Sequence, residues 1–204
     1  TPDMASIEWI ANSLYPAGYY VRDIPIAASV IVPTGWKVAT GLRPSEVTPS
    51  RVNYPVTSYE ILMDSPLIAG AHYRKIPLSP DVTLDVIADN EAELAATPEH
   101  IAAHQRLVQQ AVKTFGAQHY DHYDFLLTIS DQLGGEGLEH HRSSEDGTER
   151  GYFTDWDHQL NARNLLPHEY THSWNGKFRR GADLWTPDYR MPMEDSLLWV
   201  YEGQ

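Results

Sequence analysis

Two histidines four residues apart, with a glutamate directly after the first, are the residues in this chain best suited to chemistry. They are His168, Glu169 and His172. On an α-helix, residues i and i+4 lie on the same face, so both imidazoles can bind one metal ion. The glutamate beside them can act as the general base that takes a proton from a water on a catalytic zinc. The pattern predicts a zinc site with His168 and His172 as ligands and Glu169 as the base.

Two further stretches supply carboxylates for the same site. Residues 197–203, Leu-Leu-Trp-Val-Tyr-Glu-Gly, predict the start of a second helix that carries Glu202. A set of two histidines and this glutamate would leave one position of a tetrahedral zinc for water. Residues 134–140, Gly-Gly-Glu-Gly-Leu-Glu-His, place Glu139 on a predicted edge strand. These glycines are not expected to bind phosphate, because Glu136 and Glu139 would repel an anion.

Four motifs resemble the glycyl aminopeptidase family of zinc metallopeptidases, whose bacterial members often carry a C-terminal PDZ domain, and more distantly the aminopeptidase N family. They are Gly-Leu-Glu-His at 137–140, His-Glu-Tyr-Thr-His-Ser-Trp-Asn at 168–175, Leu-Trp-Thr-Pro-Asp-Tyr-Arg at 184–190 and Trp-Val-Tyr-Glu-Gly at 199–203. The resemblance covers nearly the whole chain. It implies a thermolysin-like (gluzincin) catalytic domain that releases small N-terminal residues, Gly or Ala, from peptides.

The resemblance also implies a role for each candidate residue. Glu202 would be the third ligand of one Zn²⁺ per chain, and Glu169 would be the base. Glu139 would bind the free α-ammonium of the peptide substrate, which sets the first peptide bond against the metal. The other histidines, including His140 and His141, are predicted to lie on the surface or in loops. His140 is the first candidate for an exception, because the motif at 137–140 contains it.

The sequence also departs from the family, whose catalytic region continues beyond Glu202. The family's transition-state tyrosine is expected beyond Gln204, so neither Tyr170 nor Tyr201 is given that role. We expect a fragment that is incomplete at both ends, binds zinc weakly, is inactive alone and self-associates through exposed apolar surface.

Two other functions fit the same sequence. One is a gluzincin endopeptidase, which would not need a free substrate amine. The other is a non-catalytic module that binds peptides or is stabilised by a metal. The presence of all four of His168, Glu169, His172 and Glu202 disfavours the second alternative.

Charge and composition narrow the possible partners. The 15 basic and 28 acidic residues give a net charge of −13, which disfavours nucleic acid and anionic membranes as partners. The chain has no cysteine, so a disulfide framework and a thiolate metal site are excluded. No apolar run has membrane-spanning length. Nothing in the sequence decides between the bacterial periplasm and the cytoplasm.

The overall pattern predicts an α+β protein. Apolar or alternating runs at 29–32, 36–39, 59–63, 73–76 and 83–87 are separated by turn signals, which predicts an antiparallel β-sheet or sandwich domain over residues 1–88. Tyr54, Tyr59 and Tyr73 within it are expected to be packing residues rather than the lining of a peptide groove. Residues 89–204 would form the catalytic domain, packed against the first.

Within the second domain the pattern alternates between helix and strand. Thr97-Pro98-Glu99 predicts a helix start and Gly116 its end. Residues 124–130 predict a buried strand, 142–157 a long polar loop and 176–195 an irregular segment. Pro167 lacks an amide donor and must lie in the first turn of the metal-binding helix, with Asn164 as its cap.

Overall fold

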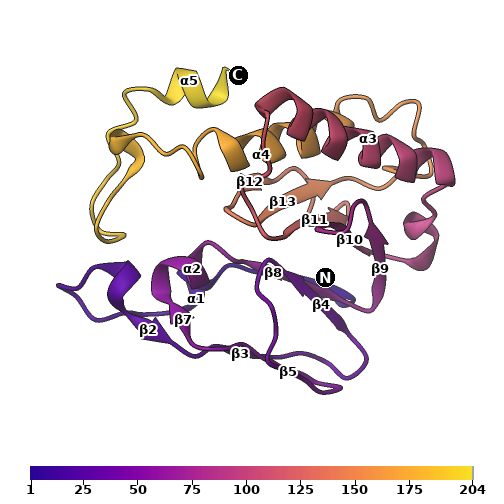
Figure 1. The fold of residues 1–204 in the computed structure, drawn as a ribbon. Coiled ribbons are helices and arrows are strands. Elements are labelled where there is room, and N and C mark those ends of the chain that lie inside the picture. Colours follow the sequence, from indigo (N-terminus) through magenta and orange to yellow (C-terminus); the bar gives the residue numbers. More distant parts are fainter. Residues whose placement is uncertain (204) are drawn as a thin grey trace.

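The N-terminal part of the chain, indigo and purple in Figure 1, consists of short antiparallel strands. The computed structural model describes residues 1–203. The strands form sheets of order β1-β8-β4, β3-β6-β5 and β2-β7. Their bounds are β1 Met4–Ile7, β2 Pro25–Ile26, β3 Ser29–Ile31, β4 Lys37–Thr40, β5 Glu46–Val47, β6 Arg51–Asn53, β7 Thr57–Ser58 and β8 Leu67–Gly70.

Short helices connect these strands: α1 (Trp9–Asn12), the 3₁₀ turn η1 (Val21–Asp23) and α2 (Tyr59–Met63). The prediction of a strand at 59–63 is wrong. The Ser58 hydroxyl accepts a hydrogen bond from the Ile61 amide at 3.2 Å and caps the helix. Tyr59, Leu62 and Met63 are buried, which is the i, i+3, i+4 spacing of one helix face.

A five-stranded mixed sheet forms the second part, with the order β12-β13-β11-β10-β9. The three inner strands are parallel, and the two edge strands are antiparallel to their neighbours. The bounds are β9 His72–Pro77, β10 Val82–Ala88, β11 Tyr123–Ile129, β12 Gly137–Glu139 and β13 Ser143–Thr148. Strands β9 and β10 lie within residues 1–88, the range predicted for the first domain, yet they belong to this sheet and not to the N-terminal sheets. The change from one set of sheets to the other therefore falls between β8 and β9.

Strand β13 replaces part of the polar loop predicted at 142–157, and that part of the prediction is wrong. All six of its residues are buried, although their sequence is Ser-Ser-Glu-Asp-Gly-Thr. Ser143 Oγ and Asp146 Oδ1 make no hydrogen bond within residues 1–203. Other polar groups of the strand do: the Ser144 hydroxyl donates to Asp146 Oδ2 at 2.7 Å and the Thr148 hydroxyl to the Thr128 carbonyl at 3.2 Å. Burial of these groups is tolerated because partners are available.

Helices cover one face of the five-stranded sheet (Figure 1). Helix α3 (Pro98–Phe115) follows the 3₁₀ turn η2 (Glu91–Leu94) and confirms the predicted helix. The Thr97 hydroxyl accepts a hydrogen bond from the His100 amide, and Gly116 ends the helix with φ 78°. A left-handed residue at this position favours glycine, which has no Cβ to clash. Apolar residues of α3 pack on the core: Ile101, Val108, Ala111, Val112 and Phe115.

The C-terminal part contains η3 (Ala162–Asn164), α4 (Leu165–Trp174), η4 (Ala182–Leu184) and α5 (Leu198–Glu202). Residues 176–195 are largely irregular, as predicted, and reach back to the N-terminal part (Figure 1). There the Val21 amide donates to the Pro187 carbonyl at 3.1 Å, and the Tyr189 amide to Tyr15 Oη at 3.0 Å. Within residues 1–203, no helix combines the length and apolar character needed to cross a membrane.

Candidate metal centre

Helix α4 has one apolar face and one face that carries the histidine pair. Leu166, Tyr170 and Trp174 recur every four residues and are buried in the core between the helices and the sheet. Asn164 occupies the cap position and Pro167 lies in the first turn, as predicted, but the Asn164 side chain makes no capping bond. Packing of the apolar face fixes the rotation of α4, so His168 and His172 point away from the core.

The two histidines meet at their Nε2 atoms, which are 3.2 Å apart. His172 is nearly buried and His168 is partly open, with side-chain exposures of 3% and 40%. His172 Nδ1 lies 3.2 Å from the Asn175 carbonyl. Donation of the Nδ1 proton to this carbonyl leaves a lone pair on His172 Nε2. The two ring nitrogens are close enough to share one hydrogen bond or to bind the same cation.

Glu202, on α5, completes the group. Its Oε2 lies 3.4 Å from His168 Nε2 and 3.6 Å from His172 Nε2. Glu169 also lies near the pair, since the ligand atoms of His168, Glu169 and His172 fall within 4.8 Å of one another. However, Glu169 Oε1 is 4.0 Å from His168 Nε2, farther than Glu202 is from either histidine. Distance therefore favours Glu202 over Glu169 as the third ligand.

The spacing of the three atoms fits a tetrahedral ion. With bonds of about 2.0 to 2.2 Å, neighbouring ligand atoms of a tetrahedron lie about 3.3 to 3.6 Å apart. The observed separations of 3.2, 3.4 and 3.6 Å agree with this within a tenth of an ångström. The donors are two imidazole nitrogens and one carboxylate oxygen, and the group is open at His168 and at Glu202. These residues can hold a metal and leave it accessible.

Two residues that the sequence analysis did not single out hold α5 in place. The Asn175 side chain, at the end of α4, donates to the Val200 carbonyl at 3.1 Å. Asp183 accepts hydrogen bonds from the Leu197 amide at 3.0 Å and from the Tyr201 hydroxyl at 3.3 Å. A polar residue in an irregular segment has no periodicity to mark it, so this tether is visible only in the fold.

Glu169 lies beneath the histidines and is 4% exposed. Burial, with repulsion from Glu139 and Glu202, raises the pKa of Glu169 to about 7, against the opposing effect of His172. A carboxylate whose pKa is near neutrality can both accept and release a proton at physiological pH. Its position and its pKa suit proton transfer.

Strand β12 lies against α4, and both Gly137 and Glu139 belong to the face that meets the helix. A Cβ on residue 137 would overlap the Glu169 carboxylate and the Leu165 side chain. Glycine at 137 therefore permits the close approach of strand and helix. Residues two apart on a strand share a face, so Glu139 is on the side of Glu169, and its charge contributes to the raised pKa.

His140 lies in the loop between β12 and β13, which agrees with the prediction of a surface or loop residue, but it is buried and not on the surface. It is 5% exposed, with Nε2 3.2 Å from Glu145 Oε2 and Nδ1 3.4 Å from Asp64 Oδ1. Burial lowers the pKa of His140, but the two carboxylates raise it by more than burial lowers it, so the net shift of the pKa is upward. Lys177 Nζ also lies 3.1 Å from Asp64. This network links the N-terminal part to the residue next to Glu139.

The structure thus brings His168, His172 and Glu202 together, places Glu169 beside them and puts Glu139 on the neighbouring strand. His141, by contrast, is largely exposed, as predicted, with 54% of its side chain open to solvent.

The solved structures with similar folds include an aminopeptidase N family protein from Idiomarina loihiensis. It is 21% identical, with a TM-score of 0.76 over 98% of this chain and 35% of that chain. Yeast LTA4 hydrolase in complex with bestatin is 17% identical, with a TM-score of 0.56 over 85% of this chain and 26% of that one. Native yeast LTA4 hydrolase is 17% identical, with a TM-score of 0.51 over 74% of this chain and 23% of that chain. The chain spans about a third or less of the length of these structures.

No curated protein matches the sequence significantly. Two family models do match it: M61 glycyl aminopeptidase over residues 161–204 and the peptidase M61 N-terminal domain over residues 1–71. The first match contains the histidine pair and Glu202, and the second ends one residue before β9 begins. Because the two models together cover more than half of the sequence, the chain belongs to the M61 glycyl aminopeptidase family.

Proposed function

We propose that the protein is a zinc-dependent aminopeptidase that releases small N-terminal residues, Gly or Ala, from peptides. The observation that carries the proposal is the set of three separations among His168 Nε2, His172 Nε2 and Glu202 Oε2, which suits one tetrahedral metal. Membership of a peptidase family supports the reaction class. The mixed sheet, the helix with the histidine pair and the third ligand on a later helix are the parts of a gluzincin catalytic domain.

His168, His172 and Glu202 would hold one Zn²⁺. When bound, this ion supplies Lewis acidity, which makes a water more acidic and polarises the scissile carbonyl. His172 is held for this role by its Nδ1 contact with the Asn175 carbonyl, which fixes the ring orientation and directs the Nε2 lone pair toward His168 and Glu202.

Glu169 is the general base of the proposed reaction. Its carboxylate accepts a proton from the attacking water and returns it to the nitrogen of the leaving peptide. The pKa near 7 permits both transfers. Burial beneath the histidine pair, at 4% exposure, excludes bulk water from the carboxylate.

Glu139 is proposed to bind the free α-ammonium of the substrate. A carboxylate on an edge strand beside α4 would form a charge-assisted contact with this group and set the first peptide bond over Glu169. The preference for Gly or Ala has its support in the family resemblance. An endopeptidase would not require Glu139 for this purpose, so the response to a blocked amine distinguishes the two activities.

The first test is metal binding. Metal analysis and calorimetric titration should find one zinc per chain in the parent protein, and His172→Ala should lose it. His141→Ala removes an exposed histidine that is not in the group and should bind zinc as the parent does. Retention of stoichiometric zinc by His172→Ala would refute the proposed site.

The second test is turnover, measured with any flanking sequence that the gene encodes. Glycyl and alanyl peptides with a free amine should be cleaved, and the same peptides after N-acetylation should not. Equal rates on the two forms would refute the aminopeptidase proposal and favour an endopeptidase. Zinc binding without cleavage of either form would favour the non-catalytic module.

A further inference from the structure

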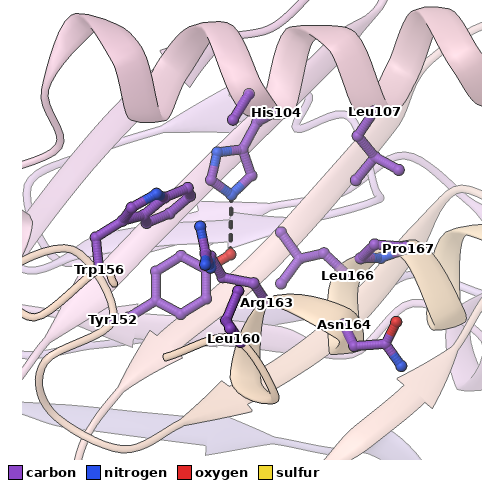
Figure 2. Close-up of a pocket in the computed structure, with 10 residues that line it drawn as sticks. His104, Leu107, Tyr152, Trp156, Leu160, Arg163, Asn164, Leu166 and Pro167 are labelled. Carbon is purple, nitrogen blue, oxygen red and sulfur yellow. Dashed lines mark hydrogen bonds between the residues drawn. The ribbon is translucent and has the colours of Figure 1, made fainter. Parts of the chain in front are cut away.

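A cavity lies at the start of α4, between that helix, α3 and the segment that follows β13 (Figure 2). Its volume is about 330 Å³, within the range of about 300 to 1,000 Å³ common for small-molecule sites. None of its lining residues belongs to the metal centre. Its walls include His104, Leu107, Tyr152, Trp156, Leu160 and Arg163.

Arg163 brings a cation into this cavity. Its guanidinium carbon lies over the Trp156 ring, 4.1 Å from the ring centroid, which is within cation–π distance. The Arg163 Nε atom is buried and makes no hydrogen bond within residues 1–203, and no carboxylate in that range forms an ion pair with Arg163. A ligand cannot bond to Nε while that atom is buried. The two terminal nitrogens of Arg163 are not buried and make no hydrogen bond within residues 1–203, so they can donate to a ligand.

The other polar groups of the cavity already have partners. The dashed line in Figure 2 marks the bond between His104 Nε2 and Tyr152 Oη, which is 2.9 Å long. His104 Nδ1 lies 2.7 Å from the His100 carbonyl. Burial lowers the pKa of His104, and Arg163 adds to the effect. His104 is therefore neutral, and among the lining residues only Arg163 carries a charge.

The remaining walls are apolar. Leu107 comes from α3, Leu160 from the segment before η3, and Trp156 closes another side. Leu160 is 67% exposed although it lines the cavity. An exposed leucine next to a cavity gives an apolar ligand a surface to cover.

We propose that this cavity binds a small apolar molecule with a single carboxylate. The carboxylate would accept hydrogen bonds from the Arg163 guanidinium, whose planar donors match its two oxygens. The apolar body would pack on Leu107, Leu160 and Trp156. The protein as a whole carries a net charge of −13 and repels anions. The Arg163 guanidinium, unpaired within residues 1–203, is what favours an anion at this cavity. Since Pro167 also lines the cavity, the ligand would lie at the start of the helix that presents His168.

The probe for this site is 3-phenylpropionate, with 3-phenylpropionamide as its uncharged analogue. Calorimetric titration in the presence of a chelator should detect one 3-phenylpropionate per chain. The amide and the Arg163→Gln variant should each weaken binding by at least about tenfold, the equivalent of about 1.4 kcal/mol for a charge-assisted contact. Leu160 is exposed, so Leu160→Gln should not affect folding. This variant should weaken binding several-fold.

Two controls separate this site from the metal centre and from general charge effects. Arg106→Gln removes the same charge from an exposed position of α3 that does not line the cavity, and binding should stay within about twofold of the parent. His172→Ala should also bind the probe normally. Equal binding by the parent, Arg163→Gln and Leu160→Gln, or loss of binding in His172→Ala alone, would overturn the proposal without affecting the proposed function.

Discussion

Gly137 and Glu169 are in direct contact across the junction of β12 and α4: the space that a Cβ of residue 137 would occupy is taken by the Glu169 carboxylate. The edge strand β12 and the helix α4 therefore approach each other so closely that a side chain larger than that of glycine would not fit at residue 137. This contact fixes the carboxylate on one side, while His168 lies on the other, with its Nε2 4.0 Å from Glu169 Oε1.

Gly137→Ala should displace the Glu169 carboxylate and leave zinc bound. We expect kcat to fall by roughly 100-fold, the scale associated with misplacing a catalytic group by about 1 Å. Overpacking should cost about 1 to 3 kcal/mol of unfolding free energy. Leu138→Ala, on the opposite face of the same strand, is the control for stability. Normal kcat in Gly137→Ala would contradict the contact.

Glu169→Gln should retain zinc and lose about 10² to 10⁴ of kcat, because the amide has a similar shape but cannot accept the proton. The measurement is metal content together with turnover of a glycyl peptide. If the variant turns over at close to the parental rate, another group is the base.

Glu139→Gln should act on substrate binding rather than on the chemistry. For a free-amine peptide, kcat/KM should fall by about 10- to 100-fold, the range of a lost charge-assisted hydrogen bond. Zinc content should not change. Glu136→Gln, an exposed neighbour, should leave kcat/KM unchanged. A similar fall in both variants would indicate a general effect of charge on this acidic surface.

Zinc should order helix α5. This helix has five residues, and Glu202 is 51% exposed at its end. Helices this short are marginal by themselves, so a ligand on one gains order from the metal. Hydrogen exchange at Val200, Tyr201 and Glu202 should slow when zinc is added, while exchange within α3 should not change. The same exchange rates with and without zinc would exclude Glu202 as a ligand.

Asp146 should make stability depend on pH. It is 1% exposed, and burial, with repulsion from Glu169 and Glu145, raises its pKa to about 8, although the Ser144 hydroxyl opposes the shift. The unfolded carboxyl titrates near about 3.9. The folded state therefore keeps a proton that the unfolded state releases, so the stability contributed below pH 4 is lost as pH rises toward 8.

Asp146→Asn removes this titration. In the metal-free protein, the unfolding free energy of the variant minus that of the parent should increase by at least about 1 kcal/mol between pH 5 and pH 8. The difference in slope is the test, because the amide adds an offset of its own. Asp157→Asn, at an exposed position, should give no such slope. Parallel pH profiles for Asp146→Asn and the parent would mean that Asp146 is ionised at neutral pH.

The sequence by itself determined the elements whose signals are local. The i, i+4 spacing placed His168 and His172 on one helix face, and Thr97 and Gly116 marked the ends of α3. Capping and helical periodicity act within a few residues along the chain, so they can be read without knowledge of distant contacts. The same holds for the buried apolar strand β11, whose run of hydrophobic residues has no other stable location.

The tertiary structure alone decided the features that depend on distant partners. Strand β13 is an inner strand although it is polar, because it pairs with β11 and β12 and its Thr148 hydroxyl donates to the Thr128 carbonyl. His140 is buried because Asp64, far away in the sequence, lies next to it. Glu202 meets the histidines because Asn175 and Asp183 hold α5. Each of these positions results from long-range contacts that pair polar groups. The pattern of hydrophobic residues along the chain does not predict which distant polar groups will pair.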